Sequence, residues 1–331
     1  MANMISSILV IIATIVLFLF AVNKFSKSIE RVAGDKMKYY LSKATSGPIR
    51  ATFLGGIVNA IIQSNTALTV TLVGLVNAGL VTLRGSLGVV IGSNVGNTLT
   101  SQLLAFNVMA FAPVFIVIGF MMRRFENPVK HYSSSVFYFG LMFLSLSYLQ
   151  LLFAPYFDSP MLLKFISGID SVSLAILIGV IGASILQSST ATSAIAITLA
   201  STGLLNFDQA FGIVVGSGVG TTVTALLASL VMNTAAQRTA FAHLWFNITT
   251  VILTLVFYTP IKSFIYFVDA GTSQLIANAH LFVSILTAIV LLLIFNVYLK
   301  FVTLIIPEKG FFHKIRGAID KKHEAPLVRS R

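Results

Sequence analysis

The residues that could do chemistry fall into two short polar motifs, each of which occurs twice. The first is Gln-Ser-Asn-Thr at Gln63–Thr66 and Gln-Ser-Ser-Thr at Gln187–Thr190. The second begins 29 residues later in each case, at Gly92–Thr98 and at Gly216–Thr222. Hydroxyls and backbone N–H groups at a helix start can hold an anion, and oxygens released at a helix break can hold Na⁺. The motifs therefore indicate a site for ions.

A duplication explains why the motifs are paired. When the chain is shifted by 124 residues, Gly55–Thr100 aligns with Gly179–Thr224 without a gap, and 18 of the 46 aligned positions are identical. Two apolar helices share Leu, Val and Ala by chance, but they do not share two polar motifs at one spacing. Internal repeats that place related segments at the membrane midplane are typical of secondary transporters.

The composition is that of a membrane protein. Of the 331 residues, 56% are hydrophobic and 10% are charged, whereas a soluble domain carries about 25% charged residues. The net charge of +12 does not indicate a nucleic-acid partner, because the basic residues lie in short blocks between apolar runs, as topology signals do. Cysteine is absent, which excludes disulfides, thiolate nucleophiles and Cys-based metal sites.

The predicted fold is an all-α polytopic membrane protein with two inverted-topology repeats and one extra C-terminal span. Each repeat contains a span, a re-entrant helical hairpin with a polar tip, a broken transmembrane helix and a second span. In the first repeat, residues 1–126, these elements cover 4–22, 51–83, 85–106 and 107–122. In the second repeat, residues 127–262, they cover 132–153, 171–205, 209–232 and 240–258. An additional transmembrane helix follows within 263–306, at about 281–306, and then a basic cytoplasmic tail over 307–331.

The distribution of charge predicts the orientation. If the hairpins are re-entrant, each half crosses three times, so the second half is inverted. An N-terminus outside the cell then leaves 20 of the 22 basic residues inside, and only Lys164 and Lys262 outside, as the positive-inside rule requires. The chain is therefore predicted to lie among the lipids of the cytoplasmic (inner) membrane with its C-terminus inside. The charges also permit hairpins that cross twice, but the 33 uncharged residues of 51–83 are fewer than the roughly 40 that two spans need.

Polar residues at membrane depth must find partners or cost several kcal/mol each. Four of them are predicted to cap half-helices, namely Ser64, Ser188, Asn97 and Thr221. The N–H groups that follow would hold an anion without any arginine or lysine. Taken alone, the Gly92–Gly96 spacing favours close helix packing, whereas the duplicated tips favour a binding site.

Acidic residues are expected outside the membrane core. All ten Asp and Glu residues fall in predicted loops or at span ends, and Glu30 and Asp208 are among them. Proton-coupled carriers bury a carboxylate or a histidine relay, so this pattern favours sodium coupling. His243 and His280 are expected to have packing or interface roles.

At these motifs the chain resembles the bacterial form of the type II sodium-dependent phosphate cotransporter family. That family carries a Gln-Ser-Ser motif and a following Gly-Ser/Ala-Asn-Ile-Gly-Thr motif in each of two inverted repeats. The resemblance covers roughly residues 4–306, with departures at Asn65, where Ser is expected, and at Gly218, where Asn is expected. It implies sodium-coupled symport of inorganic phosphate by alternating access, with sodium ions for coupling and no other cofactor.

The resemblance also implies the site residues. Phosphate would be bound by Gln63, Ser64, Asn65, Thr66, Gln187, Ser188, Ser189, Thr190 and Asn94. Sodium would be bound by Ser64, Asn94, Asn97, Thr98, Ser189, Thr190, Ser217, Thr221 and Thr222. No transition-metal site is expected.

Other functions remain open at this point. The same scaffold could carry another oxyanion or a small carboxylate, it could form an anion channel, or it could be an assembly protein that transports nothing. An enzyme is not expected, because the sequence contains no GxSxG elbow, paired-Asp site or HExxH motif. The sodium-to-phosphate ratio, the direction of transport and the oligomeric state are not determined by the sequence, and a homo-oligomer is not excluded.

Overall fold

The computed structural model describes residues 2–43, 47–106, 108–156, 159–268 and 270–308. Every regular element in these ranges is a helix, which confirms the predicted all-α class. The α-helices are α1 (Ala2–Ser42), α2 (Pro48–Ile62), α3 (Asn65–Asn77), α4 (Leu83–Ala105), α5 (Ala112–Met121), α6 (Val129–Phe153), α7 (Pro160–Ser167), α8 (Val172–Leu186), α9 (Ser189–Ser201), α10 (Phe207–Gly220), α11 (Thr222–Ser229), α12 (Thr234–Val256), α13 (Tyr258–Tyr266), α14 (Thr272–Leu293) and α15 (Phe295–Ile305).

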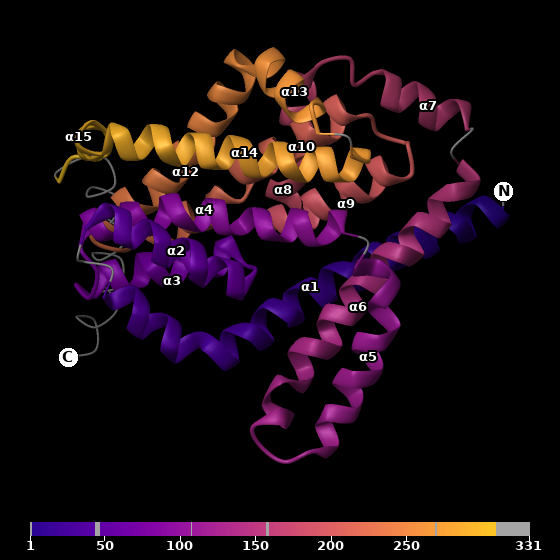
Figure 1. The fold of residues 1–331 in the computed structure, drawn as a ribbon, viewed down its shortest axis with the longest axis horizontal. Helices are drawn as coiled ribbons and strands as arrows, with labels where there is room; N and C mark the ends of the chain where they lie inside the picture. Colours follow the sequence, from indigo (N-terminus) through magenta and orange to yellow (C-terminus); the bar gives the residue numbers. More distant parts are fainter. Residues whose placement is uncertain (1, 44–46, 107, 157–158, 269, 309–331) are drawn as a thin grey trace, which may run out of the picture.

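Figure 1 shows a body of packed helices from which α5 and α6 project as an arm. Helix α1 first crosses α6, against which it packs, and then runs along the underside of α2 and α3. Two buried apolar clusters fill the body. One centres on Phe143, Phe211 and Val283, and the other on Leu68 and Phe246.

Five helical segments in the described residues are long and apolar enough to cross a membrane. They are Leu9–Ser42, Val129–Tyr156, Phe207–Ser229, Thr234–Val256 and Thr272–Leu293. A sixth is counted if Leu83–Ala105 and Met109–Arg124, which meet at a bend of 71°, form one span. The chain thus has the helices of a multi-pass membrane protein.

The sequence repeat is also a repeat of local structure. Helices α2, α3 and α4 begin at residues 48, 65 and 83, and helices α8, α9 and α10 begin at residues 172, 189 and 207. Each pair of starts differs by 124 residues, the offset at which the sequences align. Both helix–turn–helix segments also end on a glycine of positive φ, at Gly79 and Gly203.

Glycines hold each repeat together by letting two helix backbones touch. A Cβ atom on Gly92 would lie 1.7 Å from the carbonyl O of Thr52 in α2. A Cβ atom on Gly216, the equivalent position in α10, would lie 2.0 Å from the carbonyl O of Ile176 in α8. The glycine spacing therefore packs α4 on α2 and α10 on α8, as close-packed small residues do in membrane helices.

The glycines of α4 do not break that helix, and this corrects the predicted break within 85–106. Helix α4 is continuous from Leu83 to Ala105 because its glycines serve the contact with α2. The equivalent segment in the second repeat is interrupted, since α10 ends at Gly220 and α11 begins at Thr222. Gly216, Gly218 and Gly220 lie within five residues there, and glycine costs about 1 kcal/mol each in a helix interior.

Other boundaries differ from the predicted ones. Helix α1 continues twenty residues beyond the span predicted at 4–22, because residues 23–42 contain no proline and keep a helical pattern. The helix predicted at 281–306 is two helices, α14 and α15, and the first of them starts at Thr272. Helices α7 and α13 were not predicted. Most of the predicted tail, 309–331, lies outside the described residues.

Candidate ion-binding site

Both polar tips have the same geometry. Gln63 and Gln187 have φ of 57° and 51°, and they are the only non-glycine residues with positive φ among those described. A left-handed backbone at a non-glycine residue costs about 1–3 kcal/mol and is concentrated at functional sites. The chain reverses at these glutamines, so α3 and α9 start immediately after each turn.

A serine caps each of the two helices that leave the tips. The N–H of Ala67 donates to Ser64 Oγ at 3.3 Å, and the N–H of Ala191 donates to Ser188 Oγ at 3.1 Å. This confirms the predicted capping roles of both serines. Each hydroxyl keeps its own hydrogen as a donor. The first N–H groups of α3 and α9 have no intrahelical acceptor and carry the positive end of the helix dipole.

The two tips line one cavity. It has a volume of about 480 Å³ and is bounded by residues of both tips and of α1. The tip residues are Gln63, Ser64, Asn65, Thr66, Gln187, Ser188, Ser189 and Thr190. Eight of the nine residues predicted to bind phosphate therefore share one cavity, although they lie 124 residues apart in sequence. The arrangement can surround an anion with hydroxyls, amides and backbone N–H groups from two directions.

The two glutamines are not equivalent in this cavity. Gln63 accepts a hydrogen bond from Thr100 Oγ1 and donates to the carbonyl O of Ala60. The side chain of Gln187 has no hydrogen-bond partner among the described residues. The second amide is therefore available to a guest, whereas the first is tied to α4 and α2.

Asn94 is the ninth residue predicted to bind phosphate, and it does not line the cavity. Its Oδ1 accepts from Asn65 Nδ2 at 3.0 Å, and its Nδ2 donates to the carbonyl O of Val90. Asn65 Nδ2 also lies 3.1 Å from His243 Nε2. The departure from Ser at position 65 thus supplies a buried amide that joins the first tip to α4 and α12.

Asn94 instead lines a second and much smaller chamber. This chamber has a volume of about 20 Å³, enough for one water-sized species, which needs about 10–15 Å³. Its polar lining residues are Asn94, Asn97, Ser217, Asn247, Thr250, His280 and Ser284. Asn97 Oδ1 is buried without a hydrogen-bond donor among the described residues. Three of the residues predicted to bind sodium therefore meet here, and Ser64, Ser189 and Thr190 lie in the larger cavity.

The structure gives a reason for Gly218, the second departure from the family pattern. A Cβ atom at this position would lie 2.3 Å from Asn247 Oδ1. Asn94 occupies the equivalent position of the first repeat. An amide from α12 therefore fills the space that an asparagine side chain on α10 would occupy.

The remaining predicted sodium residues line neither chamber. The hydroxyls of Thr98, Thr221 and Thr222 donate to carbonyl groups of their own helices, those of Val95, Gly218 and Val219. The capping roles predicted for Asn97 and Thr221 are wrong. Asn97 lies inside α4, and Thr221 makes no side-chain cap for α11.

Several residues of the site were missed because α1 was expected to end at Val22. The longer helix brings Asn23, Ser26, Lys27 and Glu30 to the wall of the larger cavity. A lysine and a glutamate therefore line the cavity that was expected to hold neither. These residues recur at spacings of three and four, and this helical pattern could have predicted that they lie on one face of a longer α1.

The chain matches known proteins along most of its length. The profile of the Na⁺/Pi-cotransporter family matches residues 17–151 and 162–295. The chain is 29% identical over 307 residues to "Uncharacterized protein YqeW" of Bacillus subtilis, which covers 90% of this chain and 97% of that protein. It is 26% identical over 273 residues to "Putative inorganic phosphate export protein YjbB" of Salmonella typhimurium, covering 82% of this chain and 50% of that protein.

A shorter match reaches mammalian proteins. The chain is 37% identical over 84 residues to "Sodium-dependent phosphate transport protein 2C" of Rattus norvegicus, which is 24% of this chain and 14% of that protein. No solved structure matches the chain. The two profile matches contain one tip each and together cover most of the sequence. The chain belongs to the Na⁺/Pi-cotransporter family, a family of phosphate transport proteins.

Proposed function

We propose that this protein is a sodium-coupled symporter of inorganic phosphate that works by alternating access in the inner membrane. The observation that carries the proposal is the single cavity lined by both capped tips. Phosphate would sit between the starts of α3 and α9, where two helix dipoles present their positive ends. The hydroxyls of Ser64 and Ser188 and the amide of Gln187 would donate to its oxygens.

Sodium would occupy the smaller chamber and the oxygens beside the tips. The chamber offers amide and hydroxyl oxygens from α4, α10, α12 and α14, which suit a hard cation. The hydrogen bond from Asn65 to Asn94 connects a residue of the phosphate cavity to a residue of this chamber. A cation that reorients Asn94 would change the contacts of the first tip, and this gives the coupling a physical route.

The helix lengths support re-entrant tips. Helices α2 and α8 have 15 residues each, and α3 and α9 have 13. At 1.5 Å per residue these lengths are about 22 Å and 20 Å, short of a hydrocarbon core of about 30 Å. Each pair would therefore enter and leave on one side, so the two repeats would be inverted in the membrane.

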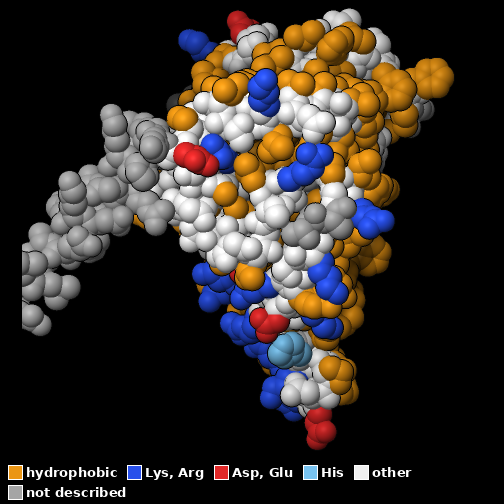
Figure 2. Space-filling model, turned by 90° about the vertical axis from the view of Figure 1, so that its left-hand side faces the viewer, with side chains coloured by type: hydrophobic (Ala, Val, Ile, Leu, Met, Phe, Trp, Pro, Cys, Tyr) orange, Lys and Arg blue, Asp and Glu red, His pale blue; other side chains and the backbone are white. Residues whose placement is uncertain are grey.

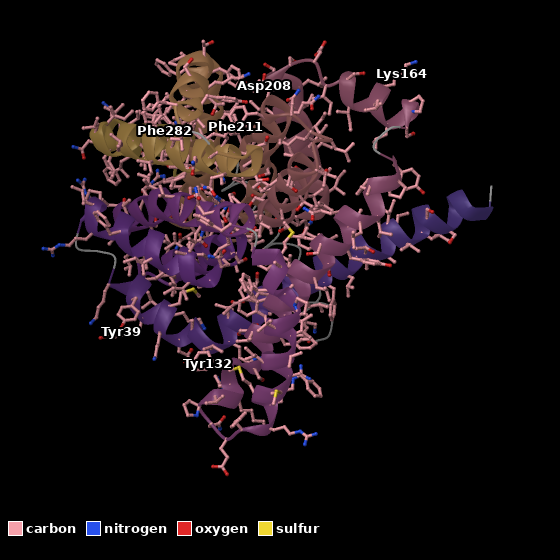
Figure 3. The ribbon with its side chains drawn as sticks, turned by 45° about the vertical axis from the view of Figure 1, so that its right-hand side comes forward. Tyr39, Tyr132, Lys164, Asp208, Phe211 and Phe282 are labelled. Atoms are coloured by element: carbon pink, nitrogen blue, oxygen red, sulfur yellow. The ribbon has the colours of Figure 1, made fainter. Side chains whose placement is uncertain are left out.

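The surface supports the proposed orientation. In Figure 2 the Lys and Arg side chains gather at the lower end of the face shown, where Figure 1 places the α5–α6 arm. Figure 3 shows Lys164 at the opposite end of the molecule from Tyr39 and Tyr132, which lie among the basic segments of α1 and α6. With the basic end inside the cell, the N-terminus would be outside.

The test is uptake of radiolabelled phosphate into proteoliposomes that contain the purified protein. We expect saturable uptake that rises when an inward sodium gradient is imposed and not when potassium replaces sodium. Equal uptake in the two salts would overturn the coupling.

The same vesicles separate the other candidates. Excess sulfate that competes equally with phosphate would indicate a general oxyanion carrier. Unitary current steps in a planar bilayer would indicate a channel. The name of the Salmonella relative says that it exports phosphate, so vesicles preloaded with phosphate should be tested for efflux under the reverse gradient.

A further inference from the structure

The larger cavity, in which we propose that phosphate binds, is lined by the two tips and by a polar and charged face of α1. Asn23, Ser26, Lys27 and Glu30 line the cavity at spacings of three and four residues, which places them on one face of the helix. Lys27 and Glu30 are the only ionisable residues among the described residues that line it. The rest of the lining is neutral.

Neither charge is neutralised by the protein. The one ion pair among the described residues is between Lys262 and Asp208, and neither of them lines this cavity. Lys27 and Glu30 are three residues apart, yet they form no ion pair with each other. The Lys27 side chain is exposed, and that of Glu30 is partly buried. The ammonium group of Lys27 is thus left for a guest.

We infer that Lys27 attracts phosphate from solution into the cavity and that Glu30 weakens the binding of phosphate there. This inference rests on the proposed phosphate transport. Lys27 would attract the oxyanion from solution and hand it to the capped tips, because a lysine ammonium is a mobile point charge that does not fix one geometry. The Glu30 carboxylate would repel the same anion, so that it is held less tightly and leaves more easily.

Helix α1 provides a matched control at Lys24. Lys24 is also exposed, but it does not line this cavity, and its Nζ lies 5.5 Å from the centre of the Phe20 ring. Replacing Lys24 changes the net charge as much as replacing Lys27 does. A difference in KM between the two variants would therefore show that Lys27 acts through its position in the cavity and not through the net charge of the protein.

The experiment measures KM for phosphate uptake in proteoliposomes with Lys27→Gln, Lys27→Arg, Lys24→Gln and Glu30→Gln. We expect Lys27→Gln to raise KM about fivefold, the effect of a solvent-screened charge pair of about 1 kcal/mol. The effect should shrink at high salt, and kcat should stay near the wild-type value. Lys27→Arg and Lys24→Gln should leave KM within twofold of wild type, and Glu30→Gln should lower it.

Equal effects of Lys27→Gln and Lys24→Gln, or a rise in KM with Glu30→Gln, would overturn the inference. Phosphate binding to the purified protein, measured by calorimetry, tests it separately from transport. If wild type binds phosphate but moves none, the proposed function fails and the affinities of the four variants still decide the role of Lys27. If wild type binds no phosphate, both fail.

Discussion

At the scale of single residues, Ser188 caps α9 and also lines the cavity, so its two roles must be separated. Ser188→Ala removes the cap, worth about 1 kcal/mol of stability. It also removes a hydrogen bond to a charged guest, worth about 1.5–3 kcal/mol, so phosphate should bind at least roughly tenfold more weakly. Calorimetric titration with phosphate gives the affinity, and thermal unfolding gives the stability.

The control for this prediction is Ser171→Ala. Ser171 caps α8 in the same way, by accepting from the N–H of Leu174 at 3.3 Å, but it does not line the cavity. We expect the same loss of stability and an unchanged phosphate affinity. If both variants lose affinity alike, Ser188 acts only through the helix.

A second prediction at this scale concerns the amide that fills the space beside Gly218. Gly218→Asn places a side chain against Asn247 Oδ1, and overpacking of this kind costs about 1–3 kcal/mol. The sodium concentration for half-maximal uptake should rise. Adding Asn247→Ala makes room and returns the amide to α10, so the double variant should recover much of the sodium response. If the double variant needs as much sodium for half-maximal uptake as Gly218→Asn does, Asn247 does not take the place of an amide on α10.

The sequence predicted the tip residues of the larger cavity because they are paired in the repeat, and it missed the residues of α1 that line the same cavity. It could not show which way each side chain turns. Asn65 lines the larger cavity but turns its Nδ2 toward Asn94 and His243. Asn94 lies outside that cavity and donates to the carbonyl O of Val90. Contacts that depend on α12 and α14, such as those of Asn247, have no counterpart in the repeat and so left no pattern to find.

At the scale of helices, the glycine contacts should be essential for packing. Gly92→Ala and Gly216→Ala would each place a methyl group inside van der Waals contact with a backbone carbonyl, and the helices would have to separate. We expect each to lower the unfolding temperature in detergent, with a cost of about 1–3 kcal/mol or more.

Gly74→Ala is the matched control for these substitutions. A Cβ atom at Gly74, inside α3, would have no neighbour within 4 Å. Alanine should therefore stabilise the protein by about 0.5–1 kcal/mol through its higher helix propensity. A loss of stability at Gly74 comparable to that at Gly92 would mean that all helix glycines are needed for some other reason.

The long helices were predictable from apolar runs, whereas the short helices α7 and α13 and the ends and breaks of the long ones were not. The glycines of α4 predicted a break that the contact with α2 removes. The charged half of α1 was taken for a loop because membrane spans end at charges, yet a helix can continue into water with its polar residues exposed. The first error arises from a tertiary contact that a single sequence does not display, and the second from reading the end of a membrane span as the end of a helix.

At the scale of the whole molecule, the absence of cysteine makes the orientation directly testable. Lys164→Cys and Lys300→Cys introduce single thiols at exposed positions of α7 and α15. A membrane-impermeant maleimide added to intact cells should label the first and not the second. Labelling of both variants after the cells are opened is the control. The reverse pattern would place the N-terminus inside.

The two repeats match in α2, α3 and α4 against α8, α9 and α10, and they diverge at the end of the third pair. Helix α4 is continuous from Leu83 to Ala105, whereas its counterpart is interrupted at Thr221, between α10 and α11. A change of shape would then bend the second repeat between α10 and α11 more easily than the first repeat at α4. The motion would be asymmetric even though the sequence is duplicated. Amide hydrogen exchange should accordingly be faster over residues 222–229 than over 98–105.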